Sequence, residues 1–284
     1  MRVLLHNRAR KVAVVALAVT TTLTGAAVIA TGSASAAPTT PTISVHMTKN
    51  KVRLSQTNVH AGLIHFRVVS SDQRFHQMQV ARMHGHYTLQ DAERDFGKAF
   101  SGDVHAVRRL DHHVAFRGGT PAHKSGYPGQ VYLDLTAGHY YVFDQDGQGL
   151  ASLNVRGTEG NKPGVQHDAQ ITATTYGFET SRLPRSGWIK FRNVSDQPHF
   201  IELTRVKDST TRRQVAREAH HPSNRQPSWL LHAGTDSSVI SPYRSEVLHY
   251  RLPAGKYLVA CFWPDDDTGM PHFYMGMWKL VHLD

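Results

Sequence analysis

One short stretch near the C-terminus collects side chains that can hold a soft metal ion. The only cysteine of the chain, Cys261, ends an apolar run, and His272 and Met277 follow it in the loop WPDDDTGMPHFYMGM. His199 opens an earlier apolar run that can lie beside the cysteine in an antiparallel β-sandwich. The soft sulfurs of such a set suit Cu(I), the imidazoles accept either oxidation state, and a weak axial methionine allows trigonal electron-transfer geometry. The sequence therefore predicts a copper site at His199, Cys261 and His272, and it leaves open whether Met275 or Met277 supplies the thioether.

The same residues have a metal-free interpretation. A lone cysteine is often a buried small apolar residue, Met275 and Met277 can belong to a core, and His199 can be a hydrogen-bonded strand-end histidine. The acidic run Asp265–Asp267 between the cysteine and His272 is typical of a solvated loop tip.

The elements that position these residues occur twice. LIHFRVVS (63–70) matches WIKFRNVS (188–195), each preceded by a glycine, and a histidine opens the next strand-like run in both halves, at His76 and at His199. VYLDLTAGHYYVF and VLHYRLPAGKYLVACF continue the match, and GLASLNV and GMWKLVH close it. Matches at successive places in one order indicate an internal duplication.

Most of these segments alternate with period two and are rich in Val, Ile, Tyr and Phe, with Gly, Pro, Asn and Asp between them. That pattern predicts an all-β fold of two tandem Greek-key β-sandwiches. Helix signals near 88–100 and 209–220 predict one short inserted helix in each. We expect the sandwiches at 44–156 and 167–284, joined by a Gly/Pro-rich linker at 157–166.

The order of the candidate ligands resembles that of the cupredoxins, the blue copper proteins, in a tandem-duplicated secreted bacterial type. The resemblance implies a cupredoxin-like sandwich in which His199 is the first ligand, Cys261 the thiolate, His272 the second imidazole and Met277 the axial thioether of one type 1-like copper. The chain departs from that family in one respect, because ten residues separate Cys261 from His272, more than the family usually has.

The first half lacks the ligand set. It keeps His76, but Asp144 stands at the position of Cys261 and Leu150 at that of Met277. We therefore expect domain 44–156 to bind no metal of this type, which favours a functional reason for the ligands of the second half.

The N-terminus reads as a Sec-type signal peptide over residues 1–36. Basic residues at 8–11 precede an apolar run at 12–30, and Ala-Ser-Ala at 34–36 fits a cleavage site. A Pro/Thr-rich tether at 37–43 follows. We expect a secreted protein with no membrane span after cleavage; the alternative is a retained anchor.

Composition narrows the function classes. The 284 residues carry a formal net charge of +10 that is spread along the chain, so we expect no nucleic-acid partner. A trinuclear oxidase site needs histidines on both sides of the cysteine, whereas Ala260 and Phe262 flank Cys261. We expect no enzyme but a secreted copper protein for electron transfer or copper handling, with a redox protein or cell-envelope component as partner. The alternative is a metal-free β-sandwich binding module of the cell envelope.

Overall fold

The computed structural model describes residues 40–72, 74–124, 127–158, 164–223 and 225–284. The predicted signal peptide and the first residues of the tether lie outside these ranges. Within the described ranges, no helix combines the length and the apolar character needed to cross a bilayer.

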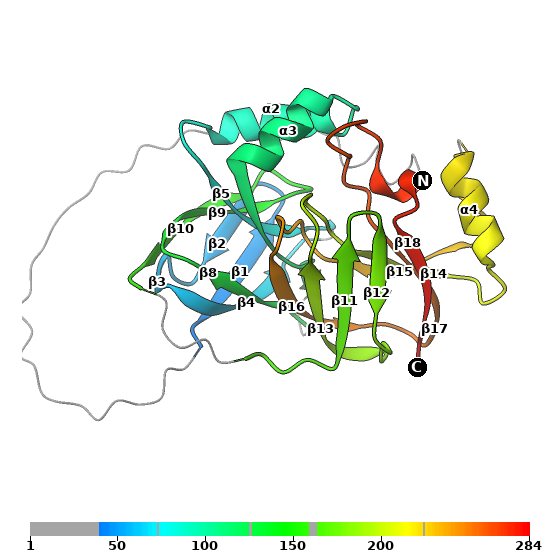
Figure 1. Cartoon of the computed structure of the whole chain (residues 1–284). Helices are drawn as coiled ribbons and strands as arrows, with labels where there is room; N and C mark the ends of the chain where they lie inside the picture. Colours follow the sequence, from blue (N-terminus) through cyan, green and yellow to red (C-terminus); the bar gives the residue numbers. More distant parts are fainter. Residues whose placement is uncertain (1–39, 73, 125–126, 159–163, 224) are drawn as a thin grey trace, which may run out of the picture.

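One large sheet runs through both halves of the chain (Figure 1). From its edge to the centre, each half contributes its strands to this sheet in the same order: the second, the first, the third and the last along the chain. The two central strands, one from each half, pair antiparallel with Val131 opposite Leu248. An internal duplication, which stays a prediction, would produce this order. The strands in spatial order are β12 (Gly177–Thr180), β11 (Ala169–Thr174), β13 (Ser186–Asn193), β16 (Ser245–Arg251), β8 (Gly129–Leu135), β4 (Gly62–Ser70), β1 (Thr42–Thr48) and β2 (Lys51–Leu54), and β7 (His123–Lys124) pairs with β4.

Two smaller sheets complete the sandwiches, one in each half. Along β4, Ile64, Phe66 and Val68 are fully buried while the residues between them are not, which is the alternation expected of a sheet with one face on a core. The prediction of an all-β sandwich fold is confirmed. The first-half sheet contains β3 (Asn58–His60), β10 (Leu150–Arg156), β9 (Gly138–Asp144), β5 (Met78–Met83) and β6 (Val114–Gly118), and the second-half sheet contains β15 (Leu230–Asp236), β14 (Glu202–Val206), β17 (Gly255–Ala260) and β18 (Trp278–Leu283).

The inserted helices follow their sequence signals, with one addition. α2 (Leu89–Ala99) and α4 (Arg212–His220) both begin with a capping box. The first insertion contains a second helix, α3 (Val104–His113), where we expected one helix. Asp103 caps it by accepting from the Ala106 amide. Its buried residues pack against α2 and β6, so tertiary contacts stabilise a helix that is too short to persist alone.

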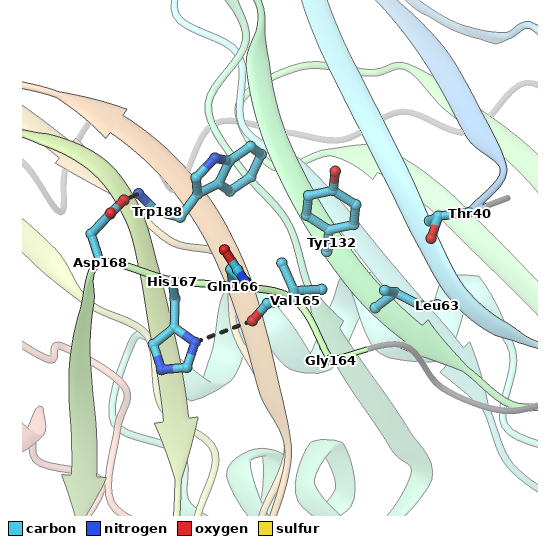
Figure 2. A pocket seen from close by; sticks show the side chains of 9 residues that line it. All are labelled: Thr40, Leu63, Tyr132, Gly164, Val165, Gln166, His167, Asp168 and Trp188. Carbon is cyan, nitrogen blue, oxygen red and sulfur yellow. Dashed lines mark hydrogen bonds between the residues drawn. The ribbon is translucent and has the colours of Figure 1, made fainter.

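A pocket of about 470 Å³ lies where the two halves meet on the large sheet, on the face opposite the core (Figure 2). Leu63, Tyr132 and Trp188 line it from three strands, and residues 164–168 and Thr40 close its rim. It shares no residue with the candidate metal ligands.

Candidate metal centre

Strand register brings the first two predicted ligands together. β14 pairs antiparallel with β17, with Glu202 opposite Ala260, the last residue of β17. Cys261 follows directly, and His199 precedes β14 in a two-residue bridge with Ile240, where each amide donates to the other residue's carbonyl at 3.1 and 2.8 Å. The cysteine and the histidine therefore face each other at the same end of the sheet.

The loop after Cys261 returns His272 to the same place. The Asp265 amide donates to the Met270 carbonyl at 2.9 Å, and the His272 amide donates to the Trp263 carbonyl at 2.9 Å. These bonds close the loop on itself, so the ten intervening residues do not prevent the second imidazole from reaching the cysteine. His272 begins a short 3₁₀ helix, η1 (His272–Met275).

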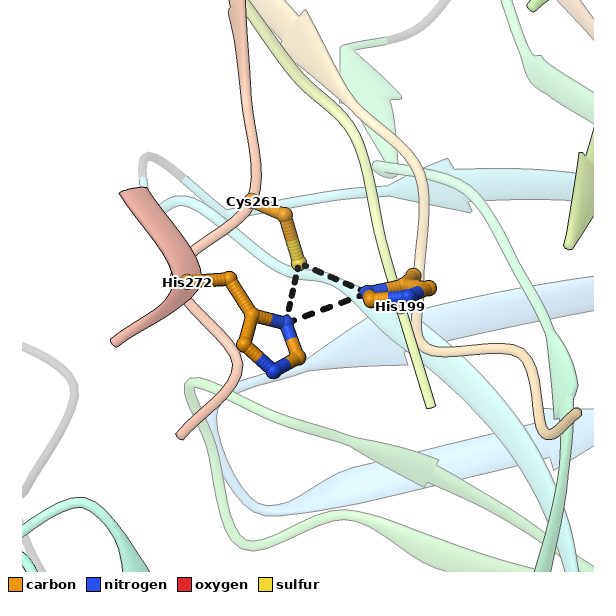
Figure 3. A group of neighbouring side chains, drawn as sticks. All are labelled: His199, Cys261 and His272. Atoms are coloured by element: carbon orange, nitrogen blue, oxygen red, sulfur yellow. Dashed lines mark hydrogen bonds between the residues drawn. The ribbon is translucent and has the colours of Figure 1, made fainter. Parts of the chain in front are cut away.

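The three side chains converge on one point (Figure 3). Cys261 Sγ lies 3.6 Å from His199 Nδ1 and 3.8 Å from His272 Nδ1, and the two Nδ1 atoms are 3.1 Å apart. All three residues are fully buried. With metal–ligand lengths of about 2.0 Å to nitrogen and about 2.3 Å to sulfur, as in zinc sites, a trigonal ion would place these atoms about 3.5 Å (N to N) and about 3.7 Å (N to S) apart. The observed spacing is close to that of a metal site.

The hydrogen bonds around His199 favour the tautomer with its proton on Nε2. Its Nε2 lies 2.8 Å from the Ser195 hydroxyl. That hydroxyl has one proton; when it donates this proton to Asn193 Oδ1 at 2.9 Å or to the Gln197 carbonyl at 3.1 Å, it accepts from His199 Nε2–H. Burial, and then the neighbouring His272, hold the pKa of His199 well below its usual value, so the ring is neutral. Nδ1 therefore presents a lone pair.

His272 is fixed in the same way by a different partner. Its Nε2 lies 2.8 Å from Gln197 Oε1, and the amide nitrogen of Gln197 donates to Asp265 Oδ2 at 3.1 Å. Burial alone would raise the pKa of Asp265, but bonds from Thr268, Tyr176 and Gln197 lower it to about 2, so this carboxylate only accepts. Gln197 must then accept from His272 Nε2. Burial lowers the pKa of His272 to about 4, and its Nδ1 also carries a lone pair.

The centre therefore has two acceptors and one donor. Burial raises the pKa of Cys261 to about 12, so without a cation the residue is a thiol with one proton. That proton can satisfy one Nδ1 atom and leaves the other lone pair facing it at 3.1 Å. A metal ion would accept electron pairs from both nitrogens and from the Cys261 sulfur, which would lose its proton and become a thiolate. The donor set fits a soft ion such as copper.

The two methionines have different surroundings. Met277 is fully buried, its amide donates to the His272 carbonyl at 3.0 Å, and its carbonyl accepts from the Cys261 amide at 3.3 Å. The Met275 sulfur instead lies 3.9 Å from the Thr268 hydroxyl oxygen, away from the three ligands. The backbone of Met277 thus runs beside two of the candidate ligands, and its thioether as axial ligand stays a prediction.

The long loop is held by helices of the first half. Trp263 is fully buried against three phenylalanines of the first half, and Arg108 of α3 donates to Asp267 Oδ1 and to the Asp266 carbonyl, both at 2.8 Å. Figure 1 shows α2 and α3 beside the β17–β18 connection. The interpretation of the acidic run as a solvated tip holds for Asp267, whose side chain is 79% exposed, but it is wrong for Asp265, which is fully buried. Five bonded donors offset the cost of burying its charge.

The equivalent place in the first half contains an ion pair. His76 Nδ1 lies 2.6 Å from Asp144 Oδ2, and its Nε2 lies 2.7 Å from Asp72 Oδ1. Burial lowers the pKa of His76, but the bonds and charges of the two carboxylates outweigh it and raise the pKa. Both ring nitrogens therefore donate, and neither is available to a metal ion.

The sequence did not point to Ser195, Gln197 or Asp265. Ser195, Gln197 and His199 are spaced by two, which is a weak signal that their side chains share one side of the chain. Nothing local indicates that Asp265 would reach Gln197.

No protein-family model and no curated protein matches this chain. Solved structures do. Auracyanin A, a "blue" copper protein from Chloroflexus aurantiacus, is 16% identical and covers 40% of this chain and 99% of its own, with a TM-score of 0.24. Copper nitrite reductase from Nitrosomonas europaea is 10% identical and covers 87% of this chain and 94% of its own, with a TM-score of 0.24. At such identities and TM-scores, these matches add nothing to what the described residues show.

Proposed function

We propose that this protein binds one copper ion through His199, Cys261 and His272, with Met277 as the axial thioether, and that it serves electron transfer or copper handling. The observation that carries the proposal is the pair of Nδ1 lone pairs, 3.1 Å apart and beside a buried thiol. In a metal-free sandwich, the alternative function, one of the two acceptors would stay unsatisfied, at a cost of roughly 1–3 kcal/mol.

Copper would supply one-electron redox chemistry at this place, and the chain's own residues prepare it. Ser195 and Gln197 hold the two rings in the tautomer that exposes Nδ1. Full burial of the three ligands keeps water from the ion. Because both rings are held before any ion arrives, little reorganisation is needed when the ion binds or changes charge.

Location, partner and absence of enzymatic activity belong to the same proposal. We place the mature protein outside the cell, after cleavage of the predicted signal peptide, with a redox protein or a cell-envelope component as its partner. The residues flanking Cys261 are Ala260 and Phe262, so no histidine next to the thiolate leads to a second copper centre. That arrangement supports a carrier of electrons or copper rather than an oxidase.

Titration of the reduced mature protein with Cu(II) tests the proposal. We expect one copper per chain and an intense thiolate-to-copper charge-transfer band. Cys261→Ser should abolish the band, because a hydroxyl is a hard donor that stays protonated near neutral pH. His272→Ala should weaken binding and leave a position that added imidazole can fill.

His76→Ala is the matched control, because His76 stands at the position equivalent to His199 but faces two carboxylates. It should leave the stoichiometry at one. Reduced wild-type protein that binds no copper, with ligand variants that lose stability as core residues do, would favour the metal-free sandwich.

A further inference from the structure

Asp265 is a fully buried carboxylate whose two oxygens have separate tasks. Oδ1 accepts from the Thr268 amide at 2.8 Å, from the Thr268 hydroxyl at 2.7 Å and from the Asp267 amide at 3.2 Å. Oδ2 accepts from the Tyr176 hydroxyl at 2.8 Å and from Gln197 Nε2 at 3.1 Å. Oδ1 therefore holds the loop, and Oδ2 faces the residues that cover His272.

Gln197 joins this carboxylate to the metal centre. A glutamine amide has two nearly isosteric orientations, and its neighbours decide between them. Because Asp265 Oδ2 only accepts, it draws the NH₂ group of Gln197 and turns Oε1 toward His272 Nε2, 2.8 Å away. The opposite orientation would present a donor to Nε2, so His272 would have to carry its proton on Nδ1.

We propose that Asp265 is a positioning residue that acts through Gln197 to set the tautomer of His272, and so creates the lone pair that faces Cys261 and His199. Asp265 does not touch the centre itself. The tautomer follows from hydrogen bonds in the metal-free chain, whereas its use for copper rests on the proposed function.

Tyr176 supports the same orientation from the surface. It lies in the turn between β11 and β12, its hydroxyl donates to Asp265 Oδ2, and its ring lies edge-to-face with the His272 ring at 5.7 Å between centroids. Oδ2 thus accepts from two donors, Tyr176 and Gln197.

The isosteric variant Asp265→Asn gives a definite expectation. Three donors still require an oxygen at the Oδ1 position, so the new NH₂ group replaces Oδ2 and donates toward Gln197. Gln197 should then accept with Oε1 and present its own NH₂ group to His272. The His272 proton should move from Nε2 to Nδ1 and close the metal-binding position.

Two-bond ¹H–¹⁵N correlation spectra of the metal-free mature protein read this out directly, because they distinguish the two imidazole tautomers. We expect Nε2–H for His272 in the wild type and Nδ1–H in Asp265→Asn. Asp267→Asn, a change at an exposed neighbour, is the matched control and should keep Nε2–H.

A double variant separates positioning from a merely structural role. In Asp265→Asn with Gln197→Glu, the new carboxylate accepts both from the new NH₂ group and from His272 Nε2–H, so the wild-type tautomer should return. Nδ1–H in the wild type, Nε2–H in the single variant, or Nδ1–H in the double variant would each overturn the inference. If the single variant does not fold, the wild type and the double variant still decide.

Cu(I) affinity, measured by competition with a chromophoric chelator, links the inference to function. Loss of a group that orients a metal ligand typically costs roughly 10–100-fold in affinity, and we expect that loss in Asp265→Asn and its recovery in the double variant. A tautomer switch in a protein that binds no copper would leave the positioning intact and refute the proposed function. Copper binding without a tautomer switch in Asp265→Asn would leave the proposed function intact and refute the positioning role of Asp265.

Discussion

Trp263 connects the candidate metal centre to the first half of the chain, and its removal should test that connection. The ring is fully buried and lies 5.8 Å from Phe96, 5.8 Å from Phe100 and 5.4 Å from Phe116, measured between ring centroids in edge-to-face contacts. The first two partners belong to α2 and its C-terminal cap, and the third to β6. Trp263→Ala empties this space.

The expected cost follows from the buried surface. A tryptophan buries about 150–250 Å², which at about 25 cal/mol per Å² gives an upper estimate of roughly 4–6 kcal/mol. Measured Trp→Ala changes in cores cost about 3–5 kcal/mol. We expect about 3–5 kcal/mol in the free energy of unfolding of the metal-free protein, and a fall in Tm of roughly 10 °C. Urea and thermal unfolding measure both.

The same change should weaken copper binding. Without Trp263 the loop keeps the bonds of Asp265 to Tyr176 and Gln197, but its contact with the first half is reduced to the bonds from Arg108, and exposed ion pairs contribute at most about 1 kcal/mol. The loop carries Asp265 and His272, so its release should lower Cu(I) affinity by roughly ten-fold or more.

Trp229→Ala is the matched control, because Trp229 is also buried, with 8% exposure, and belongs to the same hydrophobic core. It should lose comparable stability and keep the copper affinity. Equal copper affinities in the Trp263→Ala and Trp229→Ala variants would refute the idea that the first half holds the metal-binding loop.

Three further predictions concern charge and processing. The raised pKa of His76 means that its ion pair stabilises fully below pH 6.5 and is lost as pH rises through the folded value. Asp144→Asn should therefore cost roughly 3–5 kcal/mol near pH 5.5 and less in alkali, by urea unfolding; a cost independent of pH would contradict this. Burial raises the pKa of Glu246 well above 4.5, so the unfolded chain ionises first and stability falls with rising pH. Glu246→Gln should therefore raise Tm more at pH 8 than at pH 5, and an equal shift at both would contradict it. Mass spectrometry of secreted protein should find a chain starting at or beside Ala37, and Met1 retained in membranes would oppose secretion.

The sequence predicted those parts of the molecule that depend on local patterns. Period-two alternation around Ile64, Phe66 and Val68 predicted strands with one buried face, and these residues are buried. The types of His199, Cys261 and His272 predicted a common site, and strand register together with loop closure brings them together.

What the sequence did not predict depends on contacts between distant residues. Asp265 looked like part of a solvated tip, but Tyr176, 89 residues away, and the Gln197 amide make it a buried acceptor. The packing of Trp263 against α2 and β6 leaves no periodic pattern in the sequence, because Trp263 belongs to the second half of the chain and its phenylalanine partners to the first. Both features decide how the site is held, and neither is encoded in spacing along the chain.

In the proposed copper centre, one ion lies between His199 Nδ1, His272 Nδ1 and Cys261 Sγ. Diffraction from crystals of the copper-loaded mature protein, recorded on both sides of the copper absorption edge, tests it most directly. We expect one strong anomalous peak within bonding distance of all three atoms. A peak only at surface histidines such as His84 and His86, or an anomalous map with no peak between the three atoms, would contradict it.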